Sequence, residues 1–168
     1  DEGSHGDGFY KFTYEDGKYQ LNYQDVTKQQ VLDILEDINN QYLVTEYINM
    51  CDELKAVYDG AVNTVRMIVF KKDGKNPQIG NAYVRFGSKK TGAVDNVGAG
   101  GMTATIDVAT GHFHDAKIVM NNSIEDCPIH PDTGVPIDGY LPHWEQVKQQ
   151  VLDVTKSIKQ LEVFGVDL

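Results

Sequence analysis

Three glycines lie within residues 98–101, just after Asp95 and Asn96. Glycine lets a backbone approach a ligand closely and adopt the conformations that turn N–H groups toward an anion. The carboxylate and the amide next to them could coordinate a cation or bond to an oxyanion. Sequence typical of strands stands on both sides. Residues 94–101 therefore have the composition of a ligand-binding loop, and a flexible hairpin is the alternative.

Arg66 is the second residue that could take part in chemistry. It lies within an apolar, strand-like segment, between Val65 and Met67. Burying an arginine without a partner is very costly, so its side chain must either pair with an acid or face a cleft. A carboxylate such as Asp95 or Asp167 is the structural partner that we consider, and a ligand cleft is the functional one.

Histidines and cysteines offer weaker signals. His112 and His114 are two residues apart, so a strand would present both imidazoles on one face, as a zinc site or as an exposed pair. Cys51 and Cys127 lack the spacing of a metal site, and reduced thiols are favoured over a disulfide.

Composition limits the classes of partner. The formal net charge of −10 argues against binding to nucleic acid or to an anionic membrane, but it leaves phosphate ligands open. No apolar run approaches the roughly 20 residues that span a bilayer, and residues 1–4 show no signal-peptide pattern. We expect a cytoplasmic protein. A length of 168 residues with 40% hydrophobic residues is enough for one real core.

Apolar alternation predicts the strands that would position these residues. A tight-turn sequence at 15–18 between two alternating runs predicts a hairpin over residues 9–23. Further strands are predicted at 42–48, 62–71, 80–86, 102–108, 113–120 and 163–168. The second and third of these should pair antiparallel, and the fourth and fifth should form another hairpin.

Helices follow from capping and spacing. Thr27 with Gln30 three residues later is a capping box and predicts the start of a helix. A short helical turn is predicted at 51–58 and a final helix from Pro142. Residues 121–141, rich in proline, are predicted as one long loop.

Both ends of the chain have the character of cuts through a larger fold. A glycine-rich segment opens the chain with no strand before it, and the strand that starts at Val163 stops after a few residues. An incomplete sheet edge near Leu168 would invite pairing with a second copy, so a homodimer is a further prediction.

Several motifs occur in an order that resembles the ATP-grasp ligases, and most closely their sugar-transfer-associated branch. The segments that carry this resemblance are NTVRMIVF, VDNVGAGG, HPDTGVPIDGYLPHW and FGVDL. The resemblance implies an α+β fold, a partial ATP-grasp fold of mostly antiparallel sheets with packed helices. Residues 1–48 would form the glycine-rich loop, hairpin and helix of the small subdomain. Residues 49–168 would form the main subdomain, without its final strands.

The same resemblance implies how a nucleotide would be held. The glycine-rich loop that closes over the phosphates of ATP would be Gly3, Ser4, His5, Gly6 and Gly8. The backbone of a hinge strand at Glu46, Tyr47 and Ile48 would pair with the adenine edge. Glu53 would bind the ribose hydroxyls, or would simply be a solvated acid on a helix.

Catalytic and substrate roles come from the resemblance as well. Arg66 would bind the transferred phosphoryl group, and Asn96 would line the phosphate and acceptor region with Asp95, Gly100 and Gly101. Asp167 matches the first carboxylate that binds Mg²⁺ in the family. The Glu-x-Asn motif that normally follows it does not occur in this sequence.

Two interpretations are open for His130. It would be a ligand or an acid–base group at the acceptor site, or it would tie the proline-rich loop to the sheet by hydrogen bonds.

The implied activity is that of an ATP-dependent carboxylate–amine or carboxylate–hydroxyl ligase. It would act through an acyl phosphate on a small-molecule or sugar-linked acceptor in cell-surface polysaccharide synthesis, with the chain alone inactive. One alternative is a non-catalytic module that binds a nucleotide or a partner. Another is a plain α+β domain in which each glycine loop is only a turn.

Overall fold

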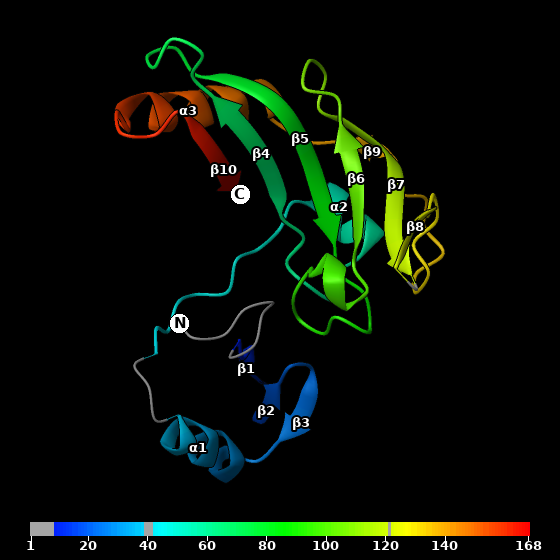
Figure 1. The fold of residues 1–168 in the computed structure, drawn as a ribbon. Coiled ribbons are helices and arrows are strands. Elements are labelled where there is room, and N and C mark those ends of the chain that lie inside the picture. Colours follow the sequence, from blue (N-terminus) through cyan, green and yellow to red (C-terminus); the bar gives the residue numbers. More distant parts are fainter. Residues whose placement is uncertain (1–8, 39–41, 121) are drawn as a thin grey trace. The chain divides into compact units, whose positions relative to one another are not determined.

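The computed structural model describes residues 9–38, 42–120 and 122–168. The chain forms two compact units, which we call unit 1 (residues 1–49) and unit 2 (residues 50–168) (Figure 1). The predicted phosphate-loop residues Gly3, Ser4, His5, Gly6 and Gly8 lie outside the described residues.

Unit 1 contains the predicted hairpin and helix. Strands β1 (Phe12–Glu15), β2 (Lys18–Leu21) and β3 (Gln24–Val26) form an antiparallel sheet, followed by α1 (Lys28–Asp37). The tight turn between β1 and β2 has positive φ angles at Asp16 and Gly17, as a two-residue hairpin loop requires. The capping box is confirmed, because the Gln30 N–H donates to Thr27 Oγ1 and the Thr27 N–H donates to Gln30 Oε1.

The predicted strand at residues 42–48 is wrong. This segment has no regular secondary structure, and the side chains of Leu43 and Val44 are 87% and 77% exposed. Its apolar residues suit a strand, but no strand among the described residues pairs with it. Without a neighbouring strand, the backbone groups have no ladder in which to form hydrogen bonds.

Unit 2 is built on an antiparallel sheet (Figure 1). Seven strands of the described residues form it, in the order β10-β4-β5-β6-β7-β8 with β9 paired to β7. The strands are β4 (Val65–Phe70), β5 (Gln78–Phe86), β6 (Met102–Ile106), β7 (His112–Met120), β8 (Ser123–Asp126), β9 (Gly139–Tyr140) and β10 (Val163–Asp167). The predicted pairings of β4 with β5 and of β6 with β7 are confirmed.

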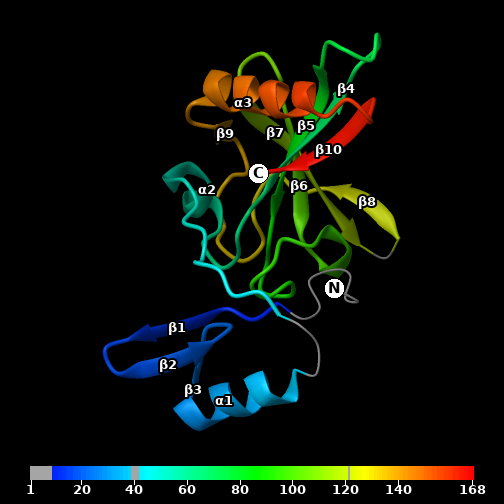
Figure 2. The ribbon, with the colours of Figure 1, turned by 90° about the vertical axis from the view of Figure 1, so that its left-hand side faces the viewer.

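Helices cover one face of this sheet. The helix α2 (Asp52–Val57) contributes Leu54 and Val57 to the core, and α3 (Trp144–Ser157) contributes Trp144 and Val151. Figures 1 and 2 show α3 running along the side of the sheet near β4 and β5. Every second strand residue points into this core: Val65, Met67, Val69, Ala82, Val84, Phe86, Met102, Ala104 and Ile106. The predicted α+β fold is confirmed.

The alternate residues of the same strands form a polar face. Side chains next to one another along β4, β5 and β6 include Arg66, Tyr83, Arg85, Thr103 and Thr105, and none of these is fully buried. Since successive side chains of a strand point to opposite faces, the pattern that builds the core also builds this polar face.

Residues 121–141 are more ordered than the single predicted loop. Strands β8 and β9 lie within this range, and Ile129 forms an isolated bridge with Pro136. The prolines lie between these paired stretches or inside the bridge, so they interrupt the ladders without preventing them. At the opposite edge of the sheet, β10 pairs only with β4 among the described residues, and the homodimer through this edge stays a prediction.

Asp73 shapes the turn between β4 and β5. Its carboxylate accepts hydrogen bonds from the backbone N–H groups of Lys75 at 3.0 Å and Asn76 at 2.8 Å, and from the side chain of Asn76. These bonds favour the ionised form and lower the pKa of Asp73 to about 2.

This lowered pKa predicts a pH dependence of stability. A carboxylate whose pKa is lower in the folded chain stabilises it fully above the unfolded pKa, and that contribution is lost as the pH falls through the folded pKa. We expect Asp73→Ala to lower the urea midpoint at pH 7, and the deficit to shrink as the pH falls from about 4 through 2. Urea titrations at each pH measure it. The difference between Asp73→Asn and Asp73→Ala should not change with pH, and a wild-type advantage over Asp73→Ala that is as large at pH 2 as at pH 7 would contradict the prediction.

Candidate functional site

A cavity of about 460 Å³ opens on the polar face of unit 2. Its walls come from β4, β5, β6 and β7 and from the loop before the short 3-10 turn at Val97–Ala99. The lining residues are Arg66, Asn81, Tyr83, Arg85, Asn96, Val97, Thr103, Thr105, Asp115 and Lys117. The site therefore lies on the polar residues of the sheet, and two residues predicted from the sequence, Arg66 and Asn96, line it.

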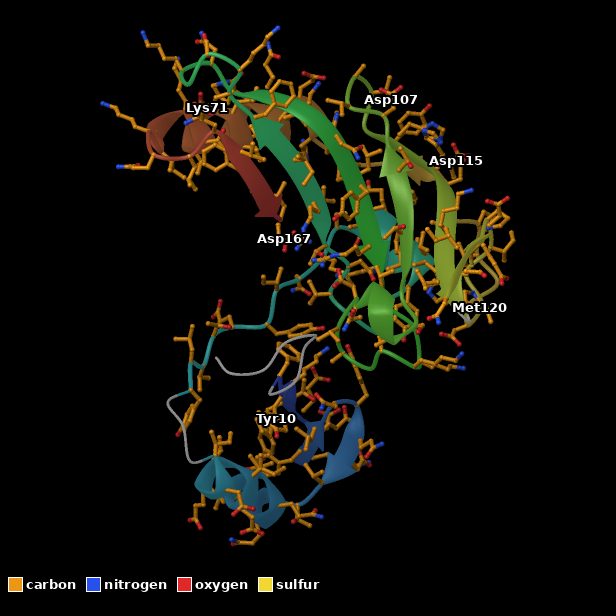
Figure 3. All side chains as sticks on the ribbon, viewed as in Figure 1. Tyr10, Lys71, Asp107, Asp115, Met120 and Asp167 are labelled. Atoms are coloured by element: carbon orange, nitrogen blue, oxygen red, sulfur yellow. The ribbon has the colours of Figure 1, made fainter. Side chains whose placement is uncertain are left out.

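Arg66 forms a two-pronged ion pair with Asp167 at the rim of this site. The two residues are register partners across β4 and β10. Arg66 Nε donates to Asp167 Oδ1 at 2.6 Å, and Nη2 donates to Oδ2 at 2.5 Å. The pair raises the pKa of Arg66 and lowers that of Asp167. Figure 3 shows Asp167 at the end of β10. Of the acid partners considered from the sequence, Asp167 is the one that Arg66 contacts.

Arg85 was not identified from the sequence, although it lies beside Arg66 in space. Its Nε and Nη2 donate to Thr64 Oγ1 at 3.0 Å and 2.6 Å. Its Nη2 also lies 3.5 Å from Asp167 Oδ2. The signal was available: Arg85 interrupts an apolar strand in the same way as Arg66.

Asp95 contacts Arg85 from the buried side, away from the cavity. The Thr64 hydroxyl and N–H donate to Asp95 Oδ2 at 2.5 Å and 2.8 Å, and Arg85 Nε lies 3.5 Å from the same oxygen. Asp95 is buried and does not line the cavity. The structure thus gives Asp95 a different position from the predicted substrate contact. Its negative charge fixes a guanidinium that faces the cavity.

The opposite wall carries Lys117 and Asp115 on β7. Lys117 pairs with Asp126 of β8, which raises the pKa of Lys117. Asp115 has a φ of 51° and sits where the register of β6 and β7 shifts, so a β-bulge places this extra residue at the cavity. Figure 3 labels Asp115 on β7. Among the described residues that line the cavity, three are cationic and one is acidic, although the chain as a whole is strongly acidic.

The glycine loop does not form the predicted cradle of N–H groups. The N–H of Gly98 donates to Asn96 Oδ1, those of Ala99 and Gly101 donate to the Asn96 carbonyl, and that of Gly100 donates to the carbonyl of Val97. These donors bond within the loop. The loop residues that line the cavity are Asn96 and Val97, and none of the three glycines does.

The glycines themselves serve the turn. Gly100 has a φ of +109°, which side chains rarely allow. A Cβ at Gly101 would lie 2.8 Å from the Phe86 carbonyl oxygen and 2.9 Å from that of Asn96. Gly100 and Gly101 are needed for the shape of the loop, and neither lines the cavity.

His130 is fully buried and does not line the cavity either. Its Nε2 lies 2.9 Å from the Gly87 carbonyl oxygen, and its Nδ1 lies 3.2 Å from the backbone nitrogen of Asp132. Since a carbonyl can only accept, Nε2 is the donor and Nδ1 accepts from the Asp132 N–H. The ring also stacks on Tyr58 at 4.7 Å between centroids. Of the two readings, the geometry matches the histidine that ties the loop to the sheet.

The predicted nucleotide contacts outside the cavity are not organised as expected. Glu46, Tyr47 and Ile48 belong to the segment without regular structure, so no hinge strand presents their backbone. Lys11 Nζ lies 3.7 Å above the Tyr47 ring, within unit 1. Glu53 is exposed in the first turn of α2, as a solvated acid would be.

A magnesium ion does not fit the residues that the structure describes. Both oxygens of Asp167 bond to Arg66, and no group of three histidine, cysteine or acidic side chains in the described part of the chain could hold a metal ion. A cation next to the guanidinium groups of Arg66 and Arg85 would be repelled by their positive charge.

Zinc has no support in the described residues for the same reason. His112 Nε2 lies 3.1 Å from Asp138 Oδ1 and His114 Nδ1 lies 2.9 Å from Asp115 Oδ2, and these side chains do not form a group of three that could hold a metal ion. Cys51 and Cys127 are free thiols, and burial raises the pKa of both.

Comparison with models of protein families gives a match that covers most of the chain. A family model described as "Sugar-transfer associated ATP-grasp" matches residues 3–168. Searches of curated proteins and of solved structures found no match. Among the described residues, no helix has both the length and the apolar character needed to cross a membrane.

Proposed function

Because the chain belongs to the sugar-transfer associated ATP-grasp family, we propose that it binds the phosphate groups of ATP in the cavity of unit 2. The observation that carries this proposal is the charge of the cavity wall. Arg66, Arg85 and Lys117 converge on it from three strands, within a chain whose net charge is −10. Guanidinium and ammonium groups are the usual protein ligands of phosphate oxygens.

In the proposed reaction a carboxylate takes the γ-phosphoryl group of ATP, which gives an acyl phosphate and ADP. An amine or hydroxyl then attacks the acyl carbon, phosphate leaves, and an amide or ester is formed. The acceptor would be a small molecule or a sugar-linked precursor of a cell-surface polysaccharide. Arg66 and Arg85 would bind the phosphate oxygens and stabilise the charge that develops during transfer. Lys117 would hold the far end of the phosphate chain, and Asn96 would donate its side-chain amide. Residues 1–48 would form the small ATP-grasp subdomain.

A second function is favoured by the pairing of Asp167 with Arg66. A chain in which the expected metal carboxylate is held by arginine would bind a nucleotide without turning it over. This is the non-catalytic module. Detection of an acyl phosphate, trapped with hydroxylamine as a hydroxamate, would distinguish the ligase from the module.

Nucleotide binding by titration calorimetry tests the proposed site. We expect ATP to bind the chain, Arg85→Lys to weaken binding by about tenfold through loss of the planar fork, and Lys117→Met to weaken it several-fold. Lys72→Met is the matched control, because it removes the same charge from an exposed residue outside the cavity. Equal affinities for Lys117→Met, Arg85→Lys and the control would show that ATP does not bind in this cavity.

A further inference from the structure

The two arginines of the cavity are held in different ways. Arg85 is fixed by Thr64 and the buried Asp95, both of which lie behind it. Arg66 donates two hydrogen bonds to Asp167, and the side chains of these two residues are 34% and 45% exposed. One guanidinium is therefore anchored within the protein, whereas the contact that holds the other is open to solvent.

The contact between Arg66 and Asp167 has the geometry of a ligand contact. Two parallel N–H donors meet two oxygens of one anionic group, at 2.6 Å and 2.5 Å. A phosphate or carboxylate group of a ligand would be bound by the same fork in the same way. A ligand anion and Asp167 therefore compete for the same two donors.

The position of Asp167 allows it to leave. It lies near the end of β10, an edge strand that pairs only with β4 among the described residues. A rotation of its side chain would release Arg66 without breaking the ladder between the two strands. Arg85 Nη2, already 3.5 Å from Asp167 Oδ2, would remain as a partner for the released carboxylate.

We propose that Asp167 occupies Arg66 in place of the ligand, and that a phosphate or carboxylate anion binds the cavity by displacing it. This proposal rests on the proposed function, since it concerns the same cavity. We call the arrangement in which Arg66 Nε and Nη2 are bonded to Asp167 the closed state. An anion binds the open state, so its apparent affinity is lowered by the fraction of chains in which the pair is closed.

A carboxylate that competes with the ligand has the opposite effect from one that holds a metal. Removing the competitor frees Arg66, so anions should bind more tightly in the absence of any divalent cation. Removing a metal ligand would leave metal-free binding unchanged and would weaken binding that depends on Mg²⁺. The sign of the change in metal-free affinity thus distinguishes the two roles.

The experiment uses tripolyphosphate as the probe, titrated into the whole chain in buffer with EDTA. We expect Asp167→Asn to bind the probe about two- to fivefold more tightly than wild type, the range set by the strength of a solvent-exposed ion pair. Asp153→Asn is the matched control, because it makes the same charge change on α3, on the covered side of the sheet. It should leave the affinity unchanged.

A double-mutant cycle shows whether the gain passes through Arg66. In an Arg66→Met background, Asp167→Asn should give no gain, because no fork remains to be released. A gain that persists in that background, or no gain in the first place, would overturn the proposal. If wild type binds tripolyphosphate and Asp167→Asn does not bind it more tightly, the competition by Asp167 is overturned. The proposed phosphate site is not, because Lys117 and Arg85 can still account for the binding. If neither wild type nor Asp167→Asn binds, the proposed function fails and the inference fails with it.

Discussion

Replacing Asp95 with alanine is expected to destabilise unit 2 by about 3 kcal/mol, because it removes one partner of a largely buried charge pair. The Asp95 carboxylate accepts two hydrogen bonds from Thr64 and lies 3.5 Å from Arg85 Nε. Without it, the Thr64 N–H loses its acceptor and the guanidinium loses the charge behind it. Urea unfolding followed by circular dichroism would measure the change in the free energy of unfolding.

The same substitution should weaken the binding of ATP, because Arg85 would no longer be held toward the cavity. Asp95→Asn is the matched control. It keeps an oxygen that can accept from Thr64, so most of the stability should return, whereas the charge that orients Arg85 does not. A free energy of unfolding for Asp95→Ala within about 0.5 kcal/mol of wild type, the range of ordinary surface substitutions, would mean that Asp95 does not have this role.

The strands of unit 2 could be predicted because their core is regular. Alternation in residues 65–70 leaves Met67 and Val69 on the buried face and Arg66 on the other. That one pattern gives the strand, its orientation and the reason why its arginine needs a partner. The capping box at Thr27 was equally local, since all its donors and acceptors lie within four residues.

Features that depend on contacts distant in sequence were not predictable in the same way. Residues 42–48 have the composition of a strand, but a strand requires a neighbour, and composition does not specify one. The importance of Arg85 depends on Asp95 and Asp167, which lie 10 and 82 residues away. The alternation of apolar residues predicts that Arg85 lies on the polar face. That Arg85 lies near Asp167 depends on how β10, β4 and β5 are aligned, which the sequence does not reveal.

Glycine loops are ambiguous for a related reason. Free N–H groups for an anion and N–H groups bonded within a turn both require glycine, so the sequence of residues 98–101 is compatible with either. The deciding fact is where each donor points. Asn96 accepts from three of the loop N–H groups through its side chain and its carbonyl, and Asn96, not the glycines, lines the cavity.

Replacing His130 with alanine is expected to lower the free energy of unfolding by about 3 kcal/mol, the combined effect of lost packing and unsatisfied buried hydrogen bonds. The ring is fully buried, and it bonds to the Gly87 carbonyl and to the Asp132 N–H. Alanine would leave both groups without these partners and a space against Tyr58. Chemical denaturation measures the loss.

The two readings of His130 predict opposite patterns, which makes this substitution decisive. A histidine that only ties the loop to the sheet affects stability, so the folded fraction of His130→Ala should bind ATP with a Kd close to that of wild type. His130→Gln, whose amide can donate to the Gly87 carbonyl, should recover part of the stability. An acceptor-site or acid–base role would instead leave stability nearly unchanged and abolish activity. Because the ring lies outside the cavity wall, we expect the first pattern.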